Sequence, residues 1–293
     1  MTKTAWVFPG QGSQEPGMGV DLLELASVKD KFEQAKEILG WSVIDVCQGK
    51  PDQLNQTLYT QPCLYVVESI LVDLLIEQGK TPNLLAGHSL GEYVALYAAG
   101  VFDFDTGLRL VKRRAQLMDS ASDGMMVALM KFDRQQLEQL IEQTPNVVLA
   151  NDNSPAQVVI SGKPEAVGEV VAQIKAKRSV TLKVSGAFHS PLIAPAADQF
   201  RKVLESVTFA DAKWPILSNV EPLPTVEAAL LKDRLQRQMT NSVRWQETSI
   251  QLQAQGIEQV VEIGPGKVLT SLIKRMCPEI SLKNITSSAQ LSS

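Results

Sequence analysis

The run from Gly87 to Gly91 (GHSLG) holds the residues of this chain that are best suited to chemistry. It has the Gly-x-Ser-x-Gly form of a nucleophile elbow, in which a serine sits on a sharp turn between a strand and a helix. A serine hydroxyl is a weak nucleophile at neutral pH and needs a base within hydrogen-bond reach. The chain has two histidines, and His88 adjoins Ser89, so its side chain should point to the other face. His189 is therefore the candidate base, with a lysine as the alternative.

The residues around the elbow fit this interpretation. The apolar run 84–87 predicts a buried strand, and 92–99 predicts a helix, which gives the strand-turn-helix context that the motif needs. A serine that precedes its histidine in the chain is typical of hydrolase-type sheets. No acidic residue stands out as a third member of a triad. The competing interpretation is that small residues only relieve crowding where a strand meets a helix.

Two further segments could serve a serine nucleophile. The polar loop 9–14 follows a predicted strand at 4–8, and a backbone N–H from it could pair with the N–H of Leu90 to bind an oxyanion. In the predicted helix 106–119, Leu110 and Arg114 lie four residues apart on one face. We expect that face to be buried, so Arg114 rather than its basic neighbours could hold a carboxylate with two hydrogen bonds.

Bulk properties exclude several classes of protein. The 293 residues carry a formal net charge of −4, which argues against nucleic-acid binding. The three cysteines show no Cys-x-x-Cys spacing, so we expect reduced thiols and no zinc site. The N-terminus has no apolar core of a signal peptide. The most apolar helix candidate, 64–76, is interrupted by Glu68 and Asp73 and looks too short to span a bilayer. A cytoplasmic protein that does not enter membranes is expected.

The element pattern predicts an α/β fold. Strands alternate with helices over 1–125 and 187–293, which indicates a hydrolase-like, mainly parallel sheet with helices on both faces. Residues 126–186 follow the order β-α-β-β-α-β, which predicts an inserted ferredoxin-like subdomain. The predicted strands of this insert are 126–131, 147–150, 157–161 and 179–184, and its helices are 133–143 and 164–177. Further helices are expected at 21–39, 64–78, 191–207, 226–238 and 267–276, and strands at 215–218 and 258–263.

Several motifs together resemble those of one enzyme family. They are 8–14 (FPGQGSQ), 87–93 (GHSLGEY), Arg114, 151–162 (NDNSPAQVVISG), 187–190 (AFHS) and 261–269 (VEIGPGKVL). In this order they are similar to those of the malonyl-CoA:acyl-carrier-protein transacylases, the malonyltransferases of type II fatty-acid synthesis. The resemblance runs nearly from end to end.

The resemblance assigns roles to residues of the site. It implies that Ser89 is acylated, that His189 is its base, and that the N–H groups of Gln11 and Leu90 form the oxyanion hole. It also implies that the imidazole is oriented by the backbone carbonyl of Gln238 instead of an acidic side chain, which explains the missing triad acid.

Substrate choice is implied in the same way. By resemblance, Arg114 binds the malonyl carboxylate. In the related acyltransferase domains of polyketide synthases, a branched residue such as Leu90 after the serine accompanies malonyl rather than methylmalonyl substrates. Phe188 would crowd an α-methyl group.

The implied reaction moves malonyl from malonyl-CoA to the phosphopantetheine thiol of acyl carrier protein, with no bound cofactor. An acidic carrier needs a basic surface, for which 175–178 and 274–275 are candidates, although solvated charge runs would look the same. We expect a monomer. Three alternatives stay open: a serine esterase or thioesterase with the same elbow, a trans-acting malonyltransferase of polyketide synthesis, and a catalytically silent carrier-docking module.

Overall fold

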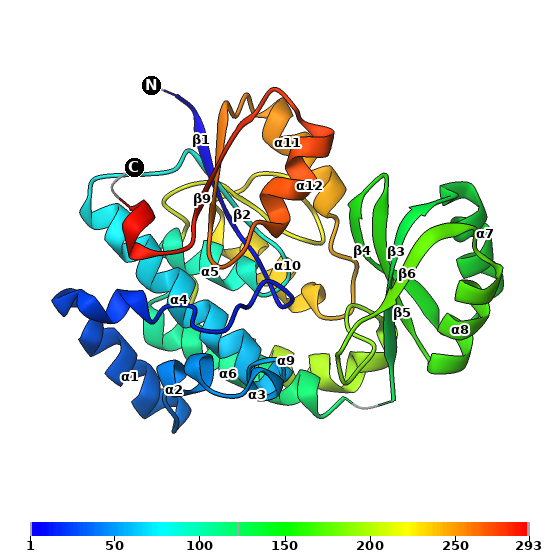
Figure 1. Ribbon diagram of the computed structural model, residues 1–293, viewed down its shortest axis with the longest axis horizontal. Coiled ribbons are helices and arrows are strands. Elements are labelled where there is room, and N and C mark those ends of the chain that lie inside the picture. Colours follow the sequence, from blue (N-terminus) through cyan, green and yellow to red (C-terminus); the bar gives the residue numbers. More distant parts are fainter. Residues whose placement is uncertain (1, 122, 292–293) are drawn as a thin grey trace.

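The computed structural model describes residues 2–121 and 123–291, and its larger sheet is parallel throughout. The strand order is β7-β2-β1-β8-β9 (Figure 1). The five strands are β1 (Thr4–Phe8), β2 (Leu84–Gly87), β7 (Ile216–Leu217), β8 (Gln259–Ile263) and β9 (Ser281–Ile285). Each pair of neighbouring strands in this sheet is parallel, so the predicted α/β class is confirmed.

Helices cover both faces of this sheet because successive side chains of a strand point to opposite sides. Trp6 and Phe8 pack into the larger apolar cluster, whereas Ala5 and Val7 pack into a second one. The helices of the first cluster are α1 (Lys29–Leu39), α2 (Val43–Gln48), α3 (Pro51–Leu54), α4 (Thr57–Glu77), α5 (Gly91–Ala98), α6 (Phe104–Asp119), α9 (Ala194–Glu205) and α10 (Ala228–Gln238). Those of the second are α11 (Trp245–Ala254) and α12 (Val268–Met276).

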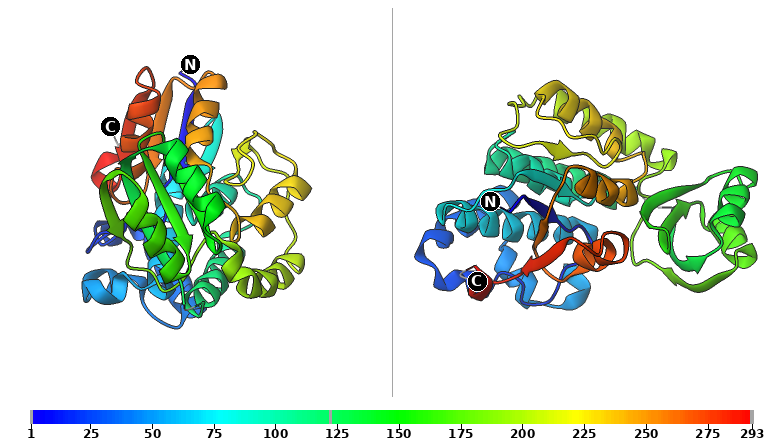
Figure 2. Two further views of the ribbon diagram at one scale, coloured as in Figure 1. Left: turned by 90° about the vertical axis from the view of Figure 1, so that its right-hand side faces the viewer. Right: turned by 90° about the horizontal axis from the view of Figure 1, so that it is seen from above.

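A four-stranded antiparallel sheet forms the smaller part of the molecule, beside the larger sheet (Figures 1 and 2). Its strand order is β4-β5-β3-β6, which in chain order is the ferredoxin-like arrangement that the sequence predicts. The elements are β3 (Met125–Phe132), α7 (Arg134–Gln143), β4 (Val147–Ser154), β5 (Gln157–Gly162), α8 (Pro164–Gln173) and β6 (Ala176–Thr181). The exact division of the chain at 126 and 186 stays a prediction.

The two sheets are joined by more than the chain connections. Val243, which precedes α11, pairs with β4: its N–H donates to Ala150 O at 2.8 Å, and its carbonyl accepts from Asp152 N at 2.9 Å. These bonds fix the smaller sheet against the carboxyl ends of the parallel strands, which is where ligands bind in open α/β sheets.

Helix α4 is longer than the sequence analysis allows. It spans 21 residues rather than the 13 of 64–76, and by length and composition alone it could cross a membrane. However, 83% of its most apolar window is buried inside the protein. Glu68, taken as an interruption, lies fully buried within it. The length argument for excluding a membrane span was therefore wrong, and burial identifies α4 as a core helix.

Other elements differ from their predicted bounds. The stretch 21–39 is not one helix, because two short 3-10 turns (Asp21–Glu24 and Ala26–Val28) precede α1. Strand β6 begins at Ala176, three residues before the predicted start, and α8 ends at Gln173. An edge strand tolerates exposed charged residues, so the basic run was misread as the end of a helix. Helix α11 and strand β9 correspond to none of the predicted elements.

Candidate active site

The turn from 87 to 91 has the geometry of a nucleophile elbow. Strand β2 ends at Gly87, α5 begins at Gly91, and Ser89 between them has a left-handed φ of 51°. A Cβ on Gly87 would lie 2.0 Å from the Gly91 carbonyl carbon, and one on Gly91 would lie 2.0 Å from Phe8 O. Both positions therefore need glycine because backbone passes where a side chain would stand.

Ser89 and His189 form a hydrogen-bonded pair. Ser89 Oγ lies 2.8 Å from His189 Nε2, and His189 Nδ1 lies 3.0 Å from Gln238 O and 3.2 Å from Asn241 O. Backbone carbonyls only accept, so Nδ1 carries the proton and Nε2 is free to accept from the serine. No acidic side chain bonds to His189 within the described chain. This arrangement can take a proton from Ser89.

Burial keeps the imidazole of His189 neutral. The residue is 4% exposed, and the pKa of His189 is lowered to about 3, first by burial and then by the nearby positive charge of Arg114. Hydrogen bonds to the two carbonyls raise the pKa of His189, but by less than burial lowers it. A neutral histidine is the form that works as a base.

His88 is the other histidine, and it turns away from the serine hydroxyl as predicted. Its Nε2 lies 2.8 Å from Asn153 Oδ1 on β4, and its ring packs against Trp245 with centroids 5.6 Å apart. Burial lowers the pKa of His88. The residue thus bonds the elbow to the smaller sheet.

Arg114 is fully buried beside Ser89, as the helical spacing predicts. Its Nη2 donates to Ser89 Oγ at 3.0 Å and to Gln238 Oε1 at 3.1 Å, and its Nη1 donates to Gln61 Oε1 at 2.8 Å. Its guanidinium also lies 5.3 Å from the centre of the Tyr93 ring. In the described part of the chain it forms no ion pair with a carboxylate. Glu92 acts on Arg114 only at longer range. A buried cation with no carboxylate in direct contact is suited to an anionic ligand.

The two candidate oxyanion donors face the same small cavity. Gln11 and Leu90 both line a cavity of about 70 Å³ that also contains Ser89, His189 and Arg114. Among the described residues, neither backbone N–H has a hydrogen-bond acceptor. The loop that carries Gln11 lies directly against the elbow, since a Cβ on Gly10 would be 2.4 Å from His88 O.

Apolar side chains from both parts of the molecule close the cavity. Phe188, 4% exposed, lies next to His189 in the wall, and Met118 comes from α6. Met126 on β3 and the segment after β6, with Leu182 and Val184, complete it from the side of the smaller sheet. The interface between two parts of one protein is a usual place for a small-molecule pocket.

Sequence reasoning missed three side chains that touch these groups. Gln61 bonds to Arg114, Asn219 bonds to the Ser89 N–H, and Gln238 contributes its side chain as well as its carbonyl. Amides in a single sequence carry no spacing signal, so their roles emerge only from the fold. The described residues contain no cluster of metal-ligating side chains.

A Ser–His pair on a nucleophile elbow, at the carboxyl edge of a parallel sheet with a ferredoxin-like insert, defines an α/β protein built for acyl chemistry. The sequence model of the acyl transferase domain family matches residues 5–291, so the chain belongs to this family.

Its relatives include a malonyl CoA-acyl carrier protein transacylase of Synechocystis sp., which is 59% identical over 97% of each chain. One from Escherichia coli K12 is 40% identical over 94% of this chain and 93% of its own. The crystal structure of the Synechocystis malonyl-CoA:ACP transacylase matches with a TM-score of 0.98 at 58% identity, over 99% of both chains. A second match is a structure of a type II polyketide acyl-carrier protein in complex with its malonyl-transacylase. The TM-score is 0.93 at 38% identity, over 99% of this chain and 98% of the matched chain.

Proposed function

We propose that this chain is a malonyl-CoA:acyl-carrier-protein transacylase. The observation that carries the proposal is the buried guanidinium of Arg114, which lies 3.0 Å from Ser89 Oγ and forms no ion pair with a carboxylate of the described chain. An esterase for neutral acyl groups has no use for such a cation. A malonyl group carries a carboxylate two bonds beyond its thioester carbonyl, where a guanidinium beside the nucleophile can meet it.

In the first half-reaction, Ser89 Oγ attacks the thioester carbon of malonyl-CoA while His189 Nε2 takes its proton. The N–H groups of Gln11 and Leu90 hold the resulting oxyanion, and such donors contribute about 3 kcal/mol each. The C–S bond then breaks, and CoA leaves as a thiol with the proton from His189. The products are malonyl-Ser89 and free CoA.

The second half-reaction reverses these steps with another thiol. The phosphopantetheine thiol of the carrier protein gives its proton to His189 Nε2 and attacks the malonyl-Ser89 ester. The C–O bond breaks, the proton returns to Ser89 Oγ, and malonyl leaves on the carrier. Throughout, the Gln238 carbonyl keeps Nδ1–H in place, so the tautomer does not change.

Substrate selection follows from the cavity walls. Arg114 binds the malonyl carboxylate and holds the acyl chain for both thiols. Phe188 and Leu90 leave little room next to the α-carbon, which disfavours a methyl branch there. Both features favour malonyl over acetyl and methylmalonyl groups.

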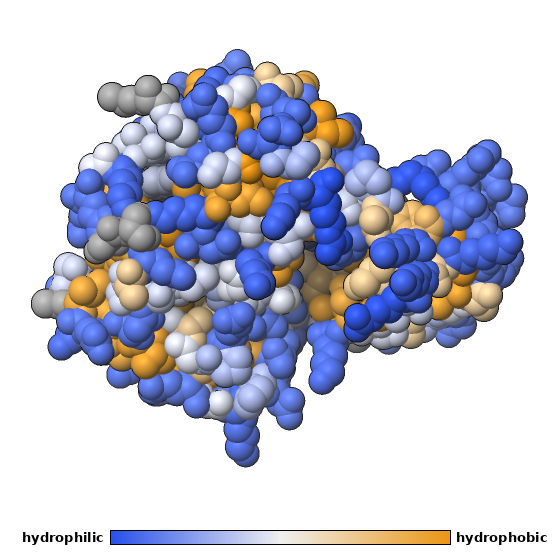
Figure 3. All heavy atoms as spheres, turned by 45° about the horizontal axis from the view of Figure 1, so that its top comes forward, coloured by the Kyte–Doolittle hydropathy of each residue, from blue (hydrophilic) through white to orange (hydrophobic). Residues whose placement is uncertain are grey.

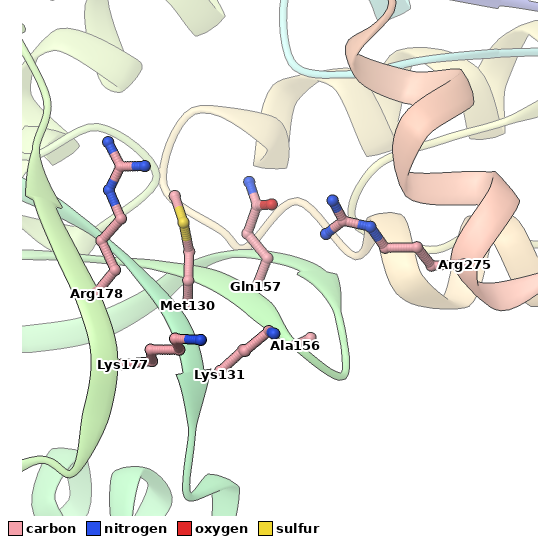
Figure 4. A pocket seen from close by; sticks show the side chains of 7 residues that line it. All are labelled: Met130, Lys131, Ala156, Gln157, Lys177, Arg178 and Arg275. Atoms are coloured by element: carbon pink, nitrogen blue, oxygen red, sulfur yellow. The ribbon is translucent and has the colours of Figure 1, made fainter.

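We propose that the carrier docks on a basic groove. The two basic runs that lie far apart in the sequence meet at a cavity of about 540 Å³, where Lys177 and Arg178 of β6, Lys131 of β3 and Arg275 of α12 converge (Figure 4). Figure 3 shows strongly hydrophilic side chains on both sides of the hollow between the two parts of the molecule. Such a surface complements an acidic partner.

A charge reversal tests the groove. Arg275→Glu should raise the KM for carrier protein about tenfold while Ser89 acylation by malonyl-CoA keeps its rate. Lys29→Glu, an exposed reversal on α1, is the matched control and should change neither. An equal loss in the acylation step would assign the groove to CoA instead and overturn the docking proposal.

The overall function is tested with labelled malonyl-CoA and mass spectrometry. We expect a malonyl adduct on Ser89 that a carrier protein discharges; no adduct, or an adduct on another residue, contradicts the proposal. Release of free malonate at the full rate without carrier would indicate a thioesterase, and carrier binding without an adduct would indicate a docking module. Fatty-acid and polyketide carriers, compared by kcat/KM, identify the pathway.

The working state is proposed to be a monomer in the cytoplasm. Light scattering after size exclusion should then give a mass near the 32.0 kDa of one chain. A mass of twice that value would contradict it.

A further inference from the structure

The left-handed conformation of Ser89 needs support from its surroundings. A residue other than glycine at φ 51° is strained by about 1–2 kcal/mol, and such strain persists only where neighbouring groups enforce it. Without that support, the residue would relax toward the right-handed geometry of the helix that follows. The Oγ and the Leu90 N–H would then move away from the cavity.

Asn219 bridges the elbow with its carboxamide. Its Oδ1 accepts from Ser89 N at 2.7 Å, and its Nδ2 donates to Gly87 O at 2.6 Å. Asn219 is 1% exposed, so no water competes for these bonds. One side chain therefore fixes the two peptide groups that precede Ser89, the one between Gly87 and His88 and the one between His88 and Ser89.

The side chain of Gln238 holds the carbonyl group of Ser89. Its Nε2 donates to Ser89 O at 2.8 Å, and its Oε1 accepts from Arg114 Nη2 at 3.1 Å. This contribution is separate from that of its backbone carbonyl, which bonds to His189. Ser89 O also accepts from Glu92 N at 3.2 Å, and Arg114 Nη2 also donates to Ser89 Oγ. Because Gln238 is fully buried, losing its amide would remove one partner from each group, and no water could replace it.

Glu92 bonds to the side chain of Gln238 and to the backbone of Asn219. Its Oε2 accepts from Gln238 Nε2 at 2.8 Å and from Asn219 N at 3.2 Å. Burial raises the pKa of Glu92, and the bond from Gln238 is the largest influence that opposes this rise. Glu92 lies three residues after Ser89 in the first turn of α5, so the elbow helix carries the anchor for its own support.

We propose that Asn219 and the side chain of Gln238 are positioning residues that hold Ser89 in its strained conformation, with Glu92 as their anchor. They touch no reacting atom in this scheme. They act by keeping Ser89 Oγ at 2.8 Å from His189 and the Leu90 N–H directed at the oxyanion. The proposal rests on the proposed function only in taking Ser89 as the nucleophile.

Two variants separate positioning from folding. Gln238→Met removes the side-chain bonds but keeps the backbone carbonyl for His189, and Asn219→Asp keeps the acceptor for Ser89 N–H but loses the donor to Gly87. Asn284→Leu is the matched control, because it also deletes an amide bond to a buried carboxylate. That carboxylate belongs to Glu262, which bonds to helix α12 and not to the elbow.

The readout is the rate at which a fluorophosphonate labels Ser89, together with kcat and KM for malonyl-CoA. We expect both elbow variants to lose 10- to 100-fold in labelling rate and kcat, with KM within threefold and the control near wild type. Labelling and kcat within twofold of wild type in folded variants, or a loss confined to KM, would overturn the proposal. Wild-type protein that labels with fluorophosphonate but not with malonyl-CoA would refute the proposed function alone.

Discussion

Replacing Arg114 with methionine should shift the pH dependence of Ser89 acylation. His189 accepts a proton only while neutral, and the charge of Arg114 helps to lower its pKa to about 3. Arg114 Nη2 lies 3.0 Å from Ser89 Oγ, which lies 2.8 Å from His189 Nε2, so the two nitrogens are at most about 6 Å apart. At that distance and an effective dielectric of about 20, two unit charges repel by roughly 3 kcal/mol. This equals about two pKa units.

The variant should therefore lose half of its labelling rate near pH 5, whereas the wild type stays flat down to about pH 4. The sign follows from the base: removing a positive neighbour raises the pKa of His189, so protonation inactivates it at higher pH. Fluorophosphonate labelling between pH 4 and 8 measures this without needing the carboxylate clamp. Arg109→Met, an exposed change on the same helix, is the control. A variant profile that coincides with the wild-type profile would refute the electrostatic argument.

Three further outcomes are expected. Arg114→Met should reduce malonyl transfer far more than acetyl transfer, since only malonyl offers a second carboxylate; equal losses in an acyl-CoA panel would refute the clamp. His189→Ala should slow acylation by about 100- to 10,000-fold in a rapid-quench assay, and a smaller loss would point to another base. Glu68→Leu should raise Tm, more at pH 8 than at pH 5: burial raises the pKa of Glu68 well above its ordinary value, so folding keeps a proton that the unfolded chain releases as pH rises. A gain that shrinks with pH would contradict this assignment.

The sequence predicts the parts of the site that depend on local geometry. The glycines around Ser89 report a turn with no space for side chains, and the helical spacing of Leu110 and Arg114 correctly predicts burial. The parallel sheet and the ferredoxin-like insert follow from the order and periodicity of the elements.

What the sequence does not predict depends on long-range contacts. Asn219 and Gln61 are polar residues without a recognisable spacing, and their partners lie 130 and 53 residues away in the chain. The convergence of Lys177 and Arg275 on one groove likewise requires the strand β6 to begin earlier than its apolar pattern suggests. Strand β9 is not predicted because its residues are mostly half-buried and do not alternate clearly between apolar and polar.

The order in which the working parts occur along the chain has a consequence during synthesis. The serine leaves the ribosome about 100 residues before its histidine and 149 before the amide that holds its carbonyl. A nascent chain therefore exposes a nucleophile with neither a base nor a fixed geometry. Translation must pass Gln238 before the cell gains an active enzyme, and chains truncated before that residue cannot consume malonyl-CoA.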